Sequence, residues 1–96
     1  MEIKKSFCVR EGMFTVQNIL ELIQINSSFD CEVSVKRKEK IINAKSILGT
    51  MNLFIYLRSG EEFTIILDGE DAKYAEQQIT TFFEKQSTGT TILSLG

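Results

Sequence analysis

The chain has 96 residues, of which 43% are hydrophobic, and carries a formal net charge of −2 at pH 7. This length and composition are typical of one globular domain, and the charge excludes a general positive field for nucleic acid. The sequence contains no histidine, so it lacks the commonest metal ligand and the most frequent acid or base near neutral pH. Since it also lacks a glycine-rich phosphate loop and the known catalytic motifs, we expect no metal, no cofactor and no enzymatic activity.

No segment approaches the roughly 18 consecutive apolar residues that cross a membrane, and residues 1–6 lack the apolar run of a signal peptide. These features predict a cytoplasmic protein. Cys8 and Cys31 lie in segments of alternating polarity and match no metal-binding spacing. Because the cytosol is reducing, we expect two free thiols.

The first part of the chain predicts a strand, a helix and a second strand. Residues 3–9 alternate as a half-buried strand does. Thr15 is a good N-cap for a helix, whose buried face is expected from residues at helical spacing: Val16, Ile19, Leu20 and Ile23. Leu22 and Ile25 would widen that face. Residues 31–36 alternate again and predict a strand with one polar face.

The middle of the chain predicts a hairpin and a short helix. The charged cluster at residues 36–40 is expected to be a solvated turn, and Ile41 and Ile42 form a short strand after it. The two strands beside the turn should pair with each other. Ser46 then begins a helical segment over residues 47–53.

The last part predicts a strand, a helix and a tail. Residues 63–67 alternate in a strand, and the acidic stretch 68–71 suits the positive end of a helix dipole. The apolar stripe of that last helix is Ala72, Ala75, Ile79, Phe82 and Phe83. The serine-, threonine- and glycine-rich residues after it predict a domain over residues 1–85 and a flexible tail over 86–96. Apolar residues in the tail leave open an edge strand or a contact with another copy.

The order of predicted elements is therefore β-α-β-β-α-β-α. Four strands and three helices in one short chain indicate an α+β fold with two layers. We expect a four-stranded, mostly antiparallel sheet with three helices on one face. The alternating strands support this arrangement, because their other face is polar.

The segment from Asn43 to Met51 reads NAKSILGTM. It resembles the HPr family, the small phosphocarriers of the bacterial sugar phosphotransferase system, and the order of elements agrees with that family. The resemblance covers residues 1–85 and implies an open-faced β-sandwich. One departure is at residues 54–58, where the connection to the last strand looks longer than is usual in the family.

The resemblance implies two functional centres, of which the first is degenerate here. The family places a histidine at the start of the first helix, followed by Ala-Arg-Pro, and passes a phosphoryl group through it. Counting forward from residue 12 puts Phe14 at the histidine position, whereas counting back from later landmarks puts Thr15 there and Gln17 at the arginine position. Neither register supplies an imidazole, and a threonine phosphoester would be too inert to pass on. We therefore expect a former active site that cannot transfer phosphate.

The second centre implied by the resemblance is a regulatory serine, which is intact as Ser46. In the family an HPr kinase/phosphorylase modifies it, and the catabolite-repression HPr-like proteins, which lack the histidine, then bind a LacI-type transcription regulator. A phosphate on a helix N-cap would lie at the positive end of the dipole, beside Lys45. Two interpretations stay open, a phosphorylated Ser46 and an unmodified cap.

The resemblance also implies a partly exposed apolar patch for partner binding, formed by Ile47, Leu48 and Met51 and enlarged by Phe14. The first hypothesis is a regulatory protein of carbon metabolism that is phosphorylated on Ser46. The alternative is a diverged binding or homodimerising domain without phosphorylation. Direct nucleic-acid binding would rest on the basic turn alone, and we do not expect it.

Overall fold

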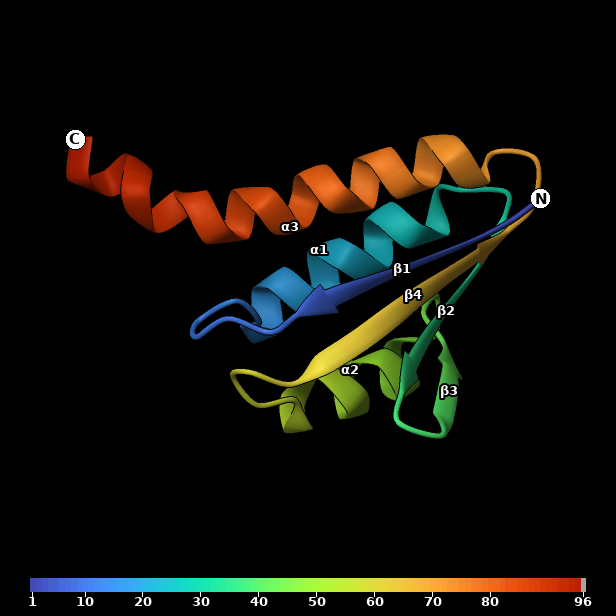
Figure 1. Cartoon of the computed structure of the whole chain (residues 1–96), viewed down its shortest axis with the longest axis horizontal. Helices are drawn as coiled ribbons and strands as arrows, with labels where there is room; N and C mark the ends of the chain where they lie inside the picture. The colour runs from blue at the N-terminus through green and yellow to red at the C-terminus, as the bar shows by residue number, and fades with distance from the viewer. Residues whose placement is uncertain (96) are drawn as a thin grey trace.

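The computed structural model of the protein describes the backbone of residues 1–95 and the side chains of residues 1–86. Its strands are β1 (Glu2–Cys8), β2 (Glu32–Arg37), β3 (Lys40–Asn43) and β4 (Glu62–Asp68). Its helices are α1 (Val16–Ser27), α2 (Ile47–Tyr56) and α3 (Ala72–Leu95). The predicted order of elements is confirmed (Figure 1).

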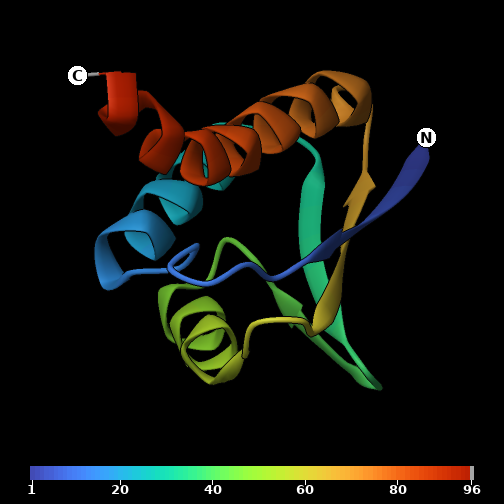
Figure 2. The same ribbon diagram turned by 60° about the vertical axis from the view of Figure 1, so that its left-hand side comes forward.

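The strands form one sheet in the order β1-β4-β2-β3, and every neighbouring pair is antiparallel. The three helices lie on one side of this sheet (Figure 2). Helix α1 packs against both α2 and α3. The predicted α+β fold, an open-faced β-sandwich of the βαββαβα type, is confirmed.

Strand β4 lies in the middle of the sheet and provides much of its buried face. Phe63, Ile65 and Leu67 are each 1% exposed, whereas the residues between them are only partly covered. The ring of Phe63 lies between 5.3 and 5.7 Å, centroid to centroid, from the rings of Phe7, Phe14, Phe54 and Phe83. One side chain of β4 therefore joins β1, the loop before α1, α2 and α3.

The buried face of α1 differs from the predicted one. Ile19 and Ile23 are buried as expected, but Val16 and Leu20 are exposed. Leu22 is also buried, as expected, and the buried face continues to Asn26, whose side-chain amide donates to the carbonyl of Ala44 at 3.1 Å. Apolar spacing alone does not reveal Asn26 as a member of this face, because its side chain is polar.

The acidic stretch lies directly before α3, as predicted. The Asp71 carboxylate also bonds outside this stretch. It accepts from the backbone N–H groups of Asp30 and Cys31, each at 2.8 Å, and so ties the loop before β2 to the start of α3. Helix α3 continues to Leu95, and the flexible tail predicted for 86–96 falls almost entirely outside the residues whose side chains are described.

Gly69 lies where the chain before α3 passes the start of β2. A Cβ atom at Gly69 would be 2.6 Å from the Cβ of Cys31, and the Gly69 backbone has φ +154°. Its N–H also donates to the carbonyl of Met1 at 2.9 Å. Only glycine fits this close approach.

We predict that Gly69→Ala destabilises the protein by about 1–3 kcal/mol more than Gly60→Ala, because overpacking adds to backbone strain. Gly60 also has a positive φ, +93°, but a Cβ atom added there would meet nothing within 4 Å, so that control should lose only about 1–2 kcal/mol. Urea denaturation measures both changes. Equal losses in the two variants would contradict the steric explanation.

Candidate functional site

The start of α2 presents Ser46 at the surface. Its backbone is extended, with φ −84° and ψ 124°, and its hydroxyl oxygen accepts from the N–H of Gly49 at 3.4 Å. The preceding turn is closed by Asn43, whose carbonyl accepts from the N–H of Ser46 and whose side chain accepts from the N–H of Lys45. Ser46 is therefore an exposed N-cap, as the sequence predicts, and its hydroxyl lies where α2 presents unpaired N–H groups.

Lys45 does not lie as the sequence suggested. Its ammonium group donates to the carbonyl of Phe29 at 2.6 Å, just beyond the end of α1. This bond joins the turn before α2 to the loop before β2. The ammonium group is thus held by a backbone carbonyl, and the bond of the Ser46 hydroxyl is to the Gly49 N–H.

The exposed face of α2 is mostly apolar and is interrupted by the polar Asn52. Leu48 is 83% exposed and Ile47 is also exposed, whereas Met51 is half-buried against the core. Part of the long connection at residues 54–58 belongs to the helix, which ends at Tyr56. Ile55 and Tyr56 therefore continue this exposed face. We call the exposed residues Ile47, Leu48, Ile55 and Tyr56 the α2 surface.

Helix α1, which packs against α2, adds two exposed apolar residues, Val16 and Leu20. Both were expected in the core, but their side chains lie at the surface.

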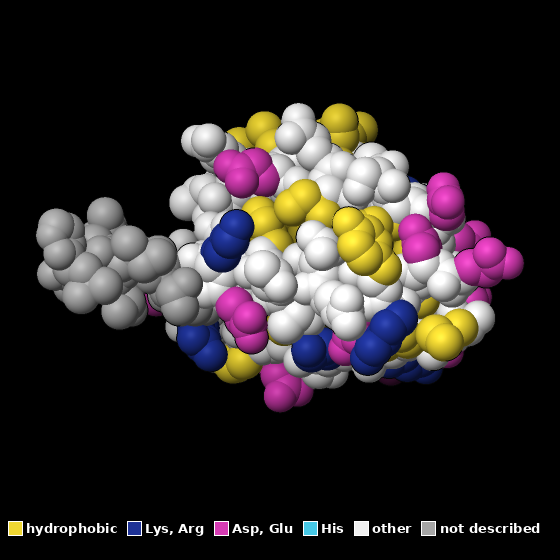
Figure 3. All heavy atoms as spheres, turned by 90° about the horizontal axis from the view of Figure 1, so that it is seen from above, with side chains coloured by type: hydrophobic (Ala, Val, Ile, Leu, Met, Phe, Trp, Pro, Cys, Tyr) yellow, Lys and Arg dark blue, Asp and Glu magenta, His cyan; other side chains and the backbone are white. Residues whose placement is uncertain are grey.

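Seen from the α3 side, apolar side chains form small areas separated by polar and charged ones (Figure 3).

Thr15 and Phe14, the two candidates for the family histidine position, have different surroundings. Thr15 is the exposed N-cap of α1, and its hydroxyl oxygen accepts from the N–H of Asn18 at 3.0 Å. The side-chain amide of Asn18 in turn donates to the carbonyl of Met13 at 3.1 Å. The Phe14 ring is half-buried and packs against the ring of Phe54, 4.4 Å away. The structure thus puts Thr15, not Phe14, at the start of the helix.

The Thr15 hydroxyl is engaged in capping with the backbone N–H of Asn18, and the Asn18 side-chain amide bonds the Met13 carbonyl instead. An amide cannot accept a proton as a general base does. Gln17 is exposed and contributes no charge. Phe14 directs its ring inward and does not join Ile47 and Leu48 on the α2 surface. The local chemistry is that of a capped helix start.

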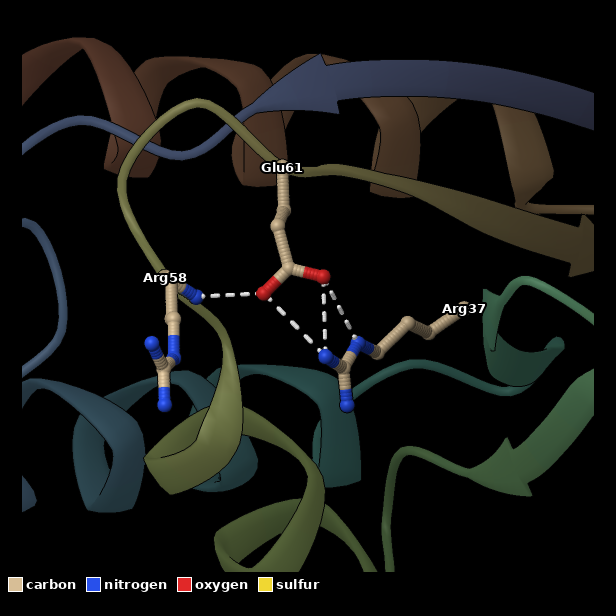
Figure 4. A network of polar contacts seen from close by, with 3 residues as sticks. All are labelled: Arg37, Arg58 and Glu61. Carbon is tan, nitrogen blue, oxygen red and sulfur yellow. Dashed lines mark hydrogen bonds and ion pairs between the residues drawn. The ribbon is translucent and has the colours of Figure 1, made fainter.

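The basic turn is solvated as predicted, except that Arg37 is partly buried and paired. Its guanidinium makes bonds of 2.8–3.2 Å to both carboxylate oxygens of Glu61, which also accepts from the N–H of Arg58 at 2.7 Å (Figure 4). The Arg37 bond, followed by the Arg58 N–H, lowers the pKa of Glu61. The network fixes the β2–β3 hairpin to the loop between α2 and β4.

Neither cysteine forms a disulfide: Cys8 is exposed and Cys31 is buried, and both are free as predicted. Burial, and then the hydrogen bond to Asp71, raise the pKa of the Cys31 thiol to about 11, so this thiol stays protonated and unreactive.

Over residues 1–86 no group of three or more potential ligands could hold a metal ion. Within the described part of the chain, no helix is both long and apolar enough to cross a bilayer.

A family model described as the PTS HPr component phosphorylation site matches residues 16–85. The chain belongs to the HPr family. Among its HPr-family relatives, the HPr-like protein Crh of Halalkalibacterium halodurans is 36% identical over 64 residues, which are 67% of this chain and 74% of the relative. The sequence resemblance is thereby confirmed.

Solved structures of the HPr family agree with this fold. The histidine-containing phosphocarrier protein of Mycoplasma superposes with a TM-score of 0.71 at 27% identity, covering 92% of this chain and 94% of its own. Crh of Bacillus subtilis, solved as a dimer with a swapping domain, gives a TM-score of 0.61 at 25% identity, covering 80% of this chain and 85% of its own.

We predict that stability falls as the pH drops below about 4.5, because hydrogen bonds lower the folded-state pKa of Glu61 and Asp71 from ordinary values of 4.5 and 3.8. Each carboxylate stabilises the fold above its unfolded pKa, and this contribution is lost as the pH falls through the lower folded pKa. As the pH is lowered through this range, the urea midpoint of a Glu61→Gln/Asp71→Asn variant should fall less steeply than that of the wild type. Glu39→Gln, a change of an exposed turn carboxylate, should keep the wild-type slope, and an unchanged slope in the double variant would contradict the assignment.

Proposed function

We propose that this protein is a non-catalytic, cytoplasmic HPr-like regulator that is phosphorylated on Ser46. The observation that carries the proposal is a contrast between the two centres. The first centre holds a threonine engaged in capping, whereas the second presents an exposed serine at the start of a helix. The family's phosphoryl transfer uses a histidine imidazole, which this chain does not contain, but a signalling phosphate needs only an accessible hydroxyl.

The geometry at Ser46 suits a phosphate without loss of the fold. The Ser46 oxygen already faces the N–H of Gly49, and phosphate oxygens would face the same end of α2. A dianion there interacts favourably with the helix dipole. Because Lys45 is held by Phe29, most of the new charge would remain available to a partner.

The partner surface that we propose is the first turn of α2, with α1 beside it. Leu48 and Ile47 are exposed next to Ser46, and Met51 borders them. An HPr kinase/phosphorylase would act on Ser46, and a LacI-type regulator would read phosphate and apolar residues together. Crh of Bacillus subtilis, whose structure resembles this chain, is described as a catabolite repression protein, which agrees with a regulatory role.

The test is incubation with an HPr kinase/phosphorylase and ATP, followed by intact-mass measurement. We expect one phosphate on the wild type, none on Ser46→Ala, and one on Ser59→Ala, which removes an exposed serine elsewhere. Phosphate uptake by Ser46→Ala would contradict the assigned site. An acid-labile phosphate acquired from a phosphocarrier donor protein would contradict the non-catalytic role.

A second candidate function is a homodimerising domain without phosphorylation. It is favoured by the length of the apolar α2 surface, and two HPr-family structures that resemble this chain were solved as dimers. In this case the α2 surface would be covered by a second copy. Exposed apolar areas of this kind commonly mark such contacts.

Sedimentation at high protein concentration separates the two functions. The second candidate predicts a dimer mass that Leu48→Ala shifts to the monomer, since the contact would lose its most exposed side chain. Tyr74→Ala, which removes an exposed aromatic residue from α3, should leave the mass unchanged. A monomer mass for the wild type at every concentration would contradict the dimer.

A further inference from the structure

A groove separates the β2–β3 turn from the second half of α2. It has a volume of about 470 Å³, and its lining includes Lys38 and Lys40 from the turn and Asn52, Leu53 and Tyr56 from the helix. It lies beyond the first turn of α2, so it is distinct from the surface proposed for Ser46. The extension of α2 past the expected end at residue 53 supplies Tyr56 to its wall.

The groove combines an apolar wall with positive charge. Leu53 is buried, while the Tyr56 ring is 64% exposed and offers a flat apolar surface with a hydroxyl. Lys38 and Lys40 are exposed, and in the described part of the chain neither makes an ion pair. Glu39, which also lines the groove, carries one negative charge against the two positive charges of these lysines. The groove is therefore locally positive on a chain whose net charge is −2.

The walls of the groove are fixed before any partner arrives. The pairing of Arg37 with Glu61, and of Glu61 with the Arg58 N–H, ties the turn to the loop that follows α2 (Figure 4). The guanidinium charge is neutralised by this pairing, so Arg37 holds the geometry while the lysines remain available. A preformed site loses less conformational entropy when it binds.

We propose that this groove binds an acidic peptide segment of a partner protein that also carries an apolar side chain. Carboxylates of the segment pair with Lys38 and Lys40, the apolar side chain packs on Tyr56 and Leu53, and the Asn52 amide is placed to bond the peptide backbone. Nucleic acid fits less well, because two unpaired cations beside a carboxylate, on an acidic chain, neutralise few phosphates. The proposal does not depend on phosphorylation of Ser46.

The test begins with a random dodecapeptide phage library panned on the wild-type protein, with counter-selection on a Lys38→Glu/Lys40→Glu variant. We expect enriched peptides that contain several acidic residues and an apolar residue. Backbone amide shifts of labelled protein, titrated with one enriched synthetic peptide, should change at residues 37–40 and 52–56. Enrichment of peptides without acidic residues, no enrichment, or shifts confined to other residues would overturn the proposal.

Matched variants then separate the groove from general charge. Lys38→Glu/Lys40→Glu and Tyr56→Ala should each raise the dissociation constant of the enriched peptide about tenfold. Lys4→Glu/Lys73→Glu, an equal charge change at exposed residues of β1 and α3, should alter it by less than about twofold, since distant charges are screened by salt. Equal weakening in both double variants would overturn the proposal, as would tighter binding of a twelve-residue oligothymidylate at the groove.

A Ser46→Ala variant distinguishes this inference from the proposed function. It should bind the enriched peptide as the wild type does, even though it takes up no phosphate. Loss of peptide binding in Ser46→Ala would show that the groove and the serine site are one surface and would overturn the inference. Circular dichroism confirms the fold of every variant before binding is measured.

Discussion

The structure depends on the burial of one face of β4. This strand enters the sheet last in the chain but lies between β1 and β2, so its inward side chains must be covered by helices from both halves of the sequence. Phe63 is the clearest case, since its ring contacts aromatic rings from β1, the loop before α1, α2 and α3. Aromatic contacts of this kind stabilise a core beyond simple area burial. The helices that carry both candidate centres are positioned by this single strand.

The two centres lie on this common framework but differ in chemistry. Thr15 and Ser46 are both N-caps with exposed side chains, and each hydroxyl accepts one backbone hydrogen bond. The difference lies in what surrounds them. Thr15 is followed by the uncharged residues Val16, Gln17 and Asn18, and its hydroxyl accepts from a backbone N–H, whereas Ser46 adjoins a mostly apolar exposed helix face. A phosphate is useful at the second position because a partner can recognise charge and apolar surface together.

Three features of the chain occur on one side of the molecule. The longer segment after residue 53 extends α2, the turn before β3 is basic, and the Arg37–Glu61 pair joins the turn to the end of the extended helix. Together they create the groove and enlarge the α2 surface. The family fold is kept because the changes lie outside the buried face of the sheet. This location favours changed partner recognition over changed stability.

Local chemistry was enough to predict the element order, the alternation of the strands and the caps at Thr15 and Ser46, because periodicity and capping depend on neighbours in the chain. The resemblance at Asn43–Met51 was enough to predict the family. The sequence did not show that the buried face of α1 includes Asn26, which occupies a core position through its bond to Ala44, and leaves Val16 and Leu20 exposed. Nor could it show that Lys45 is held by Phe29, that Asp71 binds the loop at Asp30, or that Arg37 pairs with Glu61. Those partners lie 16 to 41 residues apart in the chain, and only the packing of the sheet against its helices brings them within hydrogen-bond distance.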